Sequence, residues 1–156
     1  MGDRRQAREL ALQALFFIEM DQLCPDSSED GKVHHRAGPV PDPEYQKKID
    51  AFTVNNQDQL TPGVLPFFED LIKGVLENQS LIDNLLEEFS KNWKISRMPV
   101  VDKNIMRIAA YEMIKRDDIP TSVTINEAVE IGKKYGTRDS GPFINGVLDR
   151  IKSQRQ

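Results

Sequence analysis

Apolar residues in this chain recur with the 3.6-residue period of an α-helix, and no stretch shows the two-residue alternation of a β-strand. The pattern is clear over residues 4–20, where Leu10, Ala14, Phe17 and Ile18 keep helical spacing. Each such segment must bury its apolar face against another. The sequence therefore predicts an all-α protein of about seven helices, joined mostly by short loops.

Prolines and capping residues set the other boundaries. Asp42, Pro43 and Glu44 indicate a helix start. Gly136 is predicted to end the sixth helix in the left-handed conformation. Residues 22–43 are rich in Pro, Gly, Ser and Asp, which predicts a long mobile loop within a single domain of residues 1–156. The remaining helices are predicted over residues 62–77, from residue 80, from residue 99, over residues 122–135 and over residues 140–151.

Small residues predict close contacts between helices. Ala109, Ala110 and Gly132 leave room for a neighbouring helix in the helix–turn–helix of residues 107–136. Gly146 lies inside the last helix, where glycine costs about 1 kcal/mol relative to alanine. We therefore expect another helix to approach closely there as well.

The net charge of −4 conceals an asymmetry. Residues 10–90 hold 5 basic and 15 acidic side chains, whereas residues 91–156 hold 13 basic and 8 acidic ones. Arg4, Arg5 and Arg8 open the first helix, on turns that we expect to be exposed. A helix N-terminus favours anions over cations. The cluster therefore indicates an external polyanion, with a solvated helix start as the alternative.

The sequence contains no recognised catalytic motif. It lacks a phosphate-binding glycine loop, a dinucleotide fingerprint and an HExxH motif. Cys24 has no partner for a disulfide, and the adjacent His34 and His35 do not suit a metal site. We therefore expect a binding protein rather than an enzyme, without cofactor or metal, located in the cytoplasm and not in a membrane.

The segment GTRDSGPFINGVLDR, residues 136–150, follows Lys133 and Lys134, contains Arg138 and carries one aromatic residue. Asp139 or Ser140 is suited to cap the last helix. Phe143 stands one position before the buried stripe of that helix, so two roles remain open for it. It is either a platform on which an RNA base stacks or a staple that fixes the helix to the core.

The chain resembles the NusB family of bacterial transcription antitermination factors in three segments, RRQARELALQALF, RIAAYEMIKRDDIPTSVTINEAVEIGKKYG and FINGVLDRI. The resemblance covers both ends and most of residues 62–151, and is weak over residues 22–60. It implies an all-helical fold of two packed three-helix bundles that share the first helix.

The same resemblance implies a function. Family members bind boxA-type RNA of nascent ribosomal RNA leaders together with NusE, a small-subunit ribosomal protein. This complex joins RNA polymerase and other Nus factors, suppresses termination and supports rRNA synthesis and maturation. By position, the RNA-contacting residues of the family fall on Arg4, Arg5, Arg8, Asp139, Ser140 and Phe143, and its NusE-facing residues fall on Phe16, Val101 and Asp102. Gln6 stands where members often carry another arginine, which predicts weaker RNA binding without the partner.

Two alternatives remain open. One is a helical adaptor that binds only protein. The other is the detached RNA-binding domain of an rRNA cytosine methyltransferase, since a NusB-like domain also occurs at the front of some such enzymes. Both a monomer and a homodimer are compatible with the sequence.

Overall fold

The computed structural model describes residues 2–23, 43–91 and 93–154. Within these ranges the chain forms seven α-helices and one 3-10 helix, and no strand, which confirms the all-α prediction. The α-helices are α1 (Asp3–Leu23), α2 (Pro43–Asn55), α3 (Leu65–Glu77), α4 (Gln79–Phe89), α5 (Val100–Lys115), α6 (Thr121–Tyr135) and α7 (Ser140–Gln154), and the short 3-10 helix η1 (Ile95–Arg97) precedes α5.

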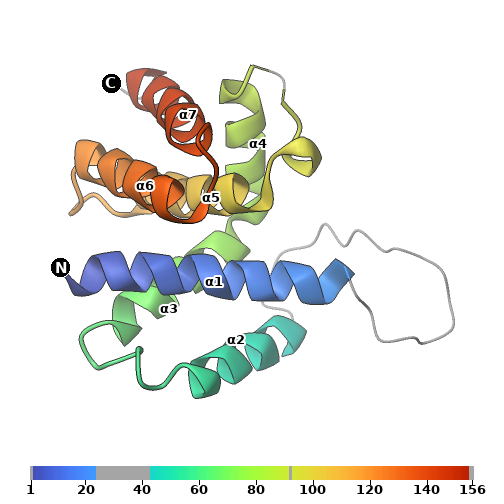
Figure 1. Cartoon of the computed structure of the whole chain (residues 1–156), viewed down its shortest axis with the longest axis vertical. Helices are drawn as coiled ribbons and strands as arrows, with labels where there is room; N and C mark the ends of the chain where they lie inside the picture. Colours follow the sequence, from blue (N-terminus) through green and yellow to red (C-terminus); the bar gives the residue numbers. More distant parts are fainter. Residues whose placement is uncertain (1, 24–42, 92, 155–156) are drawn as a thin grey trace, which may run out of the picture.

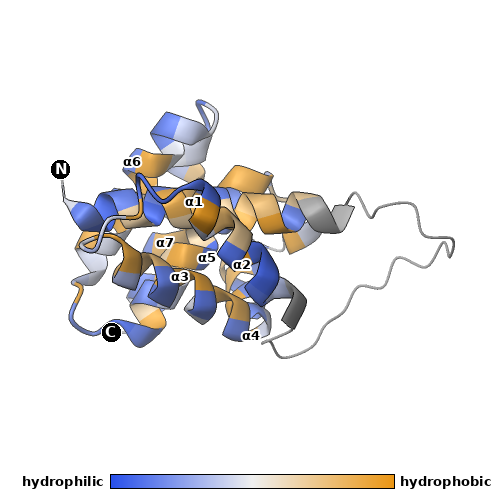
Figure 2. Ribbon diagram, turned by 90° about the horizontal axis from the view of Figure 1, so that it is seen from below, coloured by the Kyte–Doolittle hydropathy of each residue, from blue (hydrophilic) through white to orange (hydrophobic). Residues whose placement is uncertain are grey.

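The helices form two groups that share α1 (Figure 1). In that view α1, α2 and α3 make up the lower half of the molecule, and α4 to α7 make up the upper half. α1 packs against α2 and α3 on one side and against α5 on the other. Figure 2 shows that apolar and polar residues share the same helices, as expected for helices that bury one face.

One hydrophobic cluster runs through both groups. Each helix contributes to it, and its fully buried members include Leu10 of α1, Phe68 of α3, Leu86 of α4, Met106 of α5 and Leu148 of α7. Because α1 is buried between the two groups, its side chains are held by packing on several sides. A residue on α1 is therefore positioned firmly relative to α5 and α6.

Several boundaries differ from the predicted ones. α3 begins at Leu65 rather than at residue 62, because residues 61–64 form a turn closed by a hydrogen bond from Val64 N to Thr61 O. α1 is longer than predicted at both ends, and α7 is longer at its C-terminal end. Residues 22, 23 and 43 of the predicted loop are helical. The rest of that loop, with Cys24, His34 and His35, lies outside the described residues.

Two glycines allow close helix packing. A Cβ added to Gly74 of α3 would lie 2.1 Å from Cζ of Tyr111 in α5, and one added to Gly132 of α6 would lie 2.7 Å from Cδ1 of Ile144 in α7. The second finding confirms the predicted close contact at Gly132.

The predictions for Gly136 and Gly146 are wrong. Gly136 adopts an extended conformation, with φ −95° and ψ −155°, rather than the left-handed one. Glycine is required there by space, because a Cβ would lie 2.3 Å from Oγ of Ser140. The nearest neighbour to a Cβ on Gly146 would be Nη2 of Arg150, at 3.3 Å in the same helix, rather than another helix.

Candidate functional site

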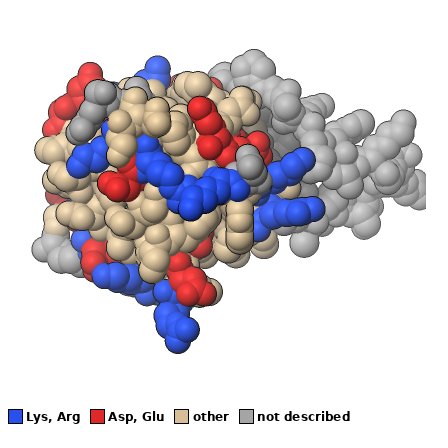
Figure 3. Space-filling model, turned by 90° about the horizontal axis from the view of Figure 1, so that it is seen from above, with Lys and Arg blue, Asp and Glu red and all other residues tan. Residues whose placement is uncertain are grey.

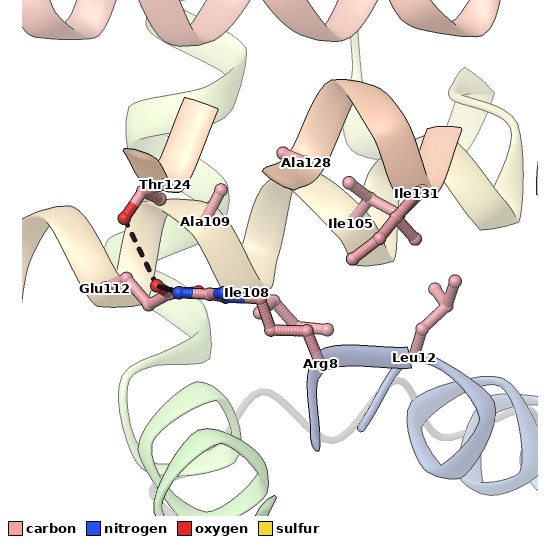
Figure 4. Close-up of a pocket in the computed structure, with 9 residues that line it drawn as sticks. All are labelled: Arg8, Leu12, Ile105, Ile108, Ala109, Glu112, Thr124, Ala128 and Ile131. Atoms are coloured by element: carbon pink, nitrogen blue, oxygen red, sulfur yellow. Dashed lines mark hydrogen bonds and ion pairs between the residues drawn. The ribbon is translucent and has the colours of Figure 1, made fainter. Parts of the chain in front are cut away.

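Arg8, the last of the three N-terminal arginines, lies in the interior of the protein. Only 4% of its side chain is exposed. Its Nε and Nη2 donate to the two carboxylate oxygens of Glu112 at 2.9 and 2.7 Å, and Oγ1 of Thr124 donates to the same carboxylate at 3.2 Å (Figure 4). The expectation that Arg8 is exposed is therefore wrong. Position 8 shares the face of α1 that packs on α5, and a buried guanidinium requires such a charged partner.

Arg5 is engaged with α6 but remains partly accessible. Its guanidinium makes a two-pronged ion pair with Glu127, and the Nη2–Oε1 distance is 2.8 Å. About a quarter of the Arg5 side chain, 26%, is exposed. The hydrogen bonds from Arg5 hold the pKa of Glu127 below its usual value, and they raise the pKa of Arg5. Arg5 therefore ties α1 to α6 while it borders solvent.

Arg4 is the most exposed of the three arginines, with 53% of its side chain accessible. Its Nη2 lies 3.3 Å from Oδ2 of Asp118 in the turn between α5 and α6. Arg116 also binds this carboxylate and, through its hydrogen bonds, lowers the pKa of Asp118 to about 2. The guanidinium carbons of Arg4, Arg8 and Arg116 lie 5.7, 5.3 and 5.1 Å from the centre of the Phe67 ring. Phe67 and Arg116 were not predicted as members of this cluster, because only the fold brings them to α1.

A polar hollow of about 290 Å³ lies between the start of α1 and the end of α6. Gln6 lines it and donates from Nε2 to the backbone oxygen of Gln59 at 3.1 Å. Lys134 donates to Glu9 at 2.8 Å, and its ammonium lies 5.1 Å from the ring centre of Tyr135. The hollow is lined by Gly2, Arg5, Gln6, Glu9, Leu10, Gln13, Gln59, Lys134 and Tyr135.

The residues expected at the start of α7 have different environments. Asp139 is exposed, whereas Ser140 is buried and its Oγ accepts a hydrogen bond from the Thr137 N–H at 2.9 Å. Phe143 is half-buried and packs against the core, and its ring centre lies 5.6 Å from that of Trp93. Trp93 is 51% exposed. This residue was not predicted, although a lone tryptophan in the basic segment KNWKISR is a signal that could have found it.

The expected partner surface is only partly accessible. Phe16 is 44% exposed on α1, and the neighbouring Phe17 is also exposed, with its ring centre 6.4 Å from that of Phe52. Val101 is partly buried against the core. Asp102 is buried, and its Oδ1 has no hydrogen-bond partner among the described residues. Burial raises the pKa of Asp102, and interaction with the Ser140 hydroxyl opposes this rise.

Among the described residues, the starts of α1 and α7, which were predicted to bind RNA together, make no direct side-chain contact with each other. In the described residues, no hydrogen bond, ion pair or ring contact links Arg4, Arg5 or Arg8 to residues 139–143. The described part of the chain also contains no group of three His, Cys, Asp or Glu side chains that could hold a metal ion. None of the described helices is long and apolar enough to cross a membrane.

Comparison with known proteins places these features in a family. The model of the NusB family matches residues 5–153. A transcription antitermination protein NusB from Desulforapulum autotrophicum is 49% identical over 152 residues, which cover 97% of this chain and 92% of the relative. A protein of the same name from Desulfitobacterium hafniense is 43% identical over 95% of this chain and 86% of its own length.

Solved structures agree with this assignment. A structure of T. maritima NusB aligns with a TM-score of 0.76 and 33% identity, over 97% of this chain and 91% of that one. A second chain, in a structure titled "Crystal Structure of a Plectonemic RNA Supercoil", shares the fold with a TM-score of 0.75 and 19% identity, over 99% of this chain and 97% of its own. The relatives from D. autotrophicum and D. hafniense are both named as transcription antitermination proteins. The chain therefore belongs to the NusB family of transcription antitermination proteins.

Proposed function

We propose that this antitermination protein acts by binding boxA-type RNA of nascent ribosomal RNA leaders together with NusE, within an RNA polymerase elongation complex that contains other Nus factors. The observation that carries the proposal is the partial exposure of Arg4 and Arg5 at the first turns of α1, beside the polar hollow. Arginine suits this task because its planar guanidinium donates to phosphate in pairs. A crystal structure whose title names an RNA contains a chain of this fold.

Within this proposal the three arginines have different roles. Arg4 and Arg5 contact RNA phosphates. To do so they give up their ion pairs with Asp118 and Glu127. Arg8 acts as a positioning residue, because its buried pair with Glu112 fixes the face of α1 on which the other two stand. At the start of α7, Asp139 and Phe143 border the RNA, while Ser140 holds the preceding turn in place.

The NusE surface is proposed to centre on Phe16 and the adjacent Phe17. Large exposed apolar side chains that lie together are typical of protein interfaces. The side chains of Lys103 and Asn104 bind Glu19 and so fix the start of α5 to this part of α1. Val101 and Asp102 therefore support the edge of this surface from the protein interior. Because Asp102 is buried, it does not offer NusE an exposed charge.

Fluorescence anisotropy with a boxA-type RNA, with and without NusE, tests the RNA contact. On single-stranded RNA each neutralised phosphate contributes about 0.7 to the slope of log affinity against log salt. The double variant Arg4→Ala/Arg5→Ala should therefore flatten the slope by up to about 1.4 units. Lys47→Ala/Lys73→Ala removes two exposed charges from α2 and α3 and should leave the slope unchanged. A protein that shows no RNA affinity in either condition is an adaptor that binds only protein.

A pull-down with NusE tests the partner surface. Phe16→Ala should weaken NusE binding, because it removes an exposed apolar contact at the centre of the surface. Leu81→Ala is the matched control, since Leu81 is 54% exposed on α4 in the other group of helices. Equal NusE binding by the two variants would place the interface elsewhere.

A further inference from the structure

The turn after α4 displays the chain's only tryptophan beside α7. Trp93 is about half exposed, and its ring lies at 43° to that of Phe143. Phe143 is anchored by the core on its other side. The two aromatic residues thus form one surface, in which Phe143 supports Trp93 and Trp93 faces solvent.

The turn that carries Trp93 is held by internal hydrogen bonds. The buried Ser90 donates from Oγ to the backbone oxygen of Trp93 at 3.0 Å. The carboxylate of Glu87 accepts a hydrogen bond from the N–H of Ile95, also at 3.0 Å. Lys91 has a positive φ of 55°, which lets the chain reverse direction after α4. The tryptophan is therefore presented on a fixed support rather than on a free loop.

Arg150 stands on the same face of α7 as Phe143. Phe143, Gly146 and Arg150 are spaced i, i+3 and i+7, which places them in one row along the helix. Nη1 of Arg150 donates to the backbone oxygen of Phe89, at the end of α4, at 2.6 Å. Nη2 lies over Gly146, where a Cβ would come within 3.3 Å of it. Gly146 therefore makes room for the guanidinium of Arg150, whose Nε and Nη2 donate to no partner in the described part of the chain.

Three exposed cations close to Trp93 in the chain have no acidic partner among the described residues. In the described part of the chain, Lys91, Lys94 and Arg97 have no carboxylate within 4.0 Å. The N-terminal arginines, in contrast, are all paired with carboxylates. Figure 3 shows a band of Lys and Arg side chains across the face of the molecule on which α4 and α7 lie. Exposed cations that flank an exposed aromatic residue in the chain suit a nucleotide, which offers a flat base and an anionic phosphate together.

We propose that Trp93, Phe143 and Arg150, together with Lys94 and Arg97, form a binding subsite for one nucleotide of single-stranded RNA. The base stacks on Trp93, and the flanking phosphates contact the guanidinium of Arg150 and the cations of the turn. This inference rests on the proposed RNA binding and extends it to the α4–α7 face. The RNA then contacts the protein at two places, the start of α1 and this subsite.

The fluorescence of Trp93 provides a direct test, because it comes from the only tryptophan in the chain. Titration with the boxA-type RNA should quench this fluorescence, with the same midpoint as anisotropy of labelled RNA. Inorganic polyphosphate supplies charge without bases, so it should bind without comparable quenching. Quenching of equal size by both polyanions would overturn the stacking proposal.

Variants separate stacking from charge. Trp93→Ala should weaken RNA binding about tenfold or more with little change of the salt slope, because it removes a stacked base contact and no charge. Trp93→Phe should restore much of the affinity. Lys94→Ala/Arg97→Ala should instead flatten the salt slope by up to about 1.4 units. Leu81→Ala, an exposed apolar control on α4, should change neither quantity. Thermal melting of each variant checks that the fold is kept.

The outcomes distinguish this inference from the proposed function. Normal RNA affinity of Trp93→Ala, with no quenching in the wild-type protein, would overturn the subsite and leave RNA binding at α1 intact. Complete absence of RNA binding, with and without NusE, would overturn both. Weaker NusE binding by Trp93→Ala, with unchanged RNA affinity, would identify the surface as a protein interface and also overturn the proposal.

Discussion

Arg4, Arg5 and Arg8 are identical in type and lie within two turns of one helix, yet their surroundings differ greatly. Their side chains are 53%, 26% and 4% exposed. Exposed ion pairs contribute about 0–1 kcal/mol to stability. Removing one partner of a buried pair costs about 3–5 kcal/mol, because the other charge stays in the interior without compensation. The three pairs therefore cannot be interchanged in a mutational experiment.

We expect Arg8→Ala to destabilise the protein by about 3–5 kcal/mol, since it leaves Glu112 buried without its partner. Arg4→Ala should change the free energy of unfolding by less than about 1 kcal/mol, because its pair with Asp118 is exposed. Urea unfolding followed by circular dichroism measures both values. Equal stabilities of the two variants would show that the Arg8–Glu112 pair does not hold α1 to α5.

Asp102 is a buried carboxylate whose Oδ1 has no partner and whose pKa is raised by burial. A carboxyl with a raised pKa in the folded state favours the protonated form, so its charge destabilises the fold above that pKa. We expect Asp102→Asn to be more stable than the wild type at neutral pH, by up to about 1 kcal/mol. This difference should shrink as the pH falls through the raised pKa. Urea unfolding midpoints at neutral and mildly acidic pH test the expectation, which a less stable Asn variant would contradict.

At the scale of the helices, α3 and α5 approach closely because Gly74 has no side chain. The ring of Tyr111 occupies the space beside it, and its hydroxyl donates to Asp70 of α3 at 2.7 Å. Burial and this neighbouring carboxylate raise the pKa of Tyr111 to about 12. The contact therefore joins α3, in the lower group of helices, to α5, in the upper group.

Gly74→Ala should destabilise the protein by about 1–3 kcal/mol, although alanine favours a helix, because the new Cβ overlaps the Tyr111 ring. Gly141→Ala is the matched control in α7. Its Cβ would lie 3.6 Å or more from the neighbouring side chains, so we expect a gain of about 0.5–1 kcal/mol. Thermal melting of both variants should show shifts of opposite sign. Two shifts of the same sign would contradict the proposed packing.

At the scale of the whole molecule, carboxylates connect the start of α1 to α5, to α6 and to the turn between them. Asp118 and Glu127, the partners of Arg4 and Arg5, both have lowered pKa values, which result first from hydrogen bonds donated by Arg116 and Arg5 respectively. A carboxylate with a lowered folded-state pKa stabilises the fold above its unfolded pKa. This stabilisation is lost as the pH falls through the folded-state value.

We therefore expect the protein to lose stability between about pH 4.5 and pH 2, the interval from the ordinary carboxyl pKa values to that of Asp118. Asp118→Asn should reduce the slope of stability against pH within this interval. Asp117→Asn is the control, because Asp117 is an exposed neighbour for which the structure shows no ion pair within the described residues. Unfolding midpoints across the interval provide the measurement, and equal slopes for both variants would contradict the assignment.

The sequence alone determined the fold class and most of the helices. Helical periodicity is a local property that each segment carries by itself, and prolines and capping residues mark its ends. The resemblance of three segments was enough to indicate the NusB family, which the comparisons confirm. The close contact at Gly132 was also predicted, whereas the same reasoning was wrong at Gly146.

Only the tertiary structure decided which functional side chains are accessible. The exposure of Arg8 and Asp102 depends on how α1, α5 and α6 pack. The rotation of each helix about its own axis, which decides this, is not encoded in the residue spacing of a single helix. The lack of space for a side chain at Gly136 depends on the position of Ser140, and Gly146 leaves room for Arg150 rather than for a neighbouring helix. The pairing of Trp93 with Phe143 joins residues fifty positions apart in the chain. Such contacts arise because the burial of apolar surface sets the arrangement of the helices, and the polar side chains take the positions that this arrangement leaves to them.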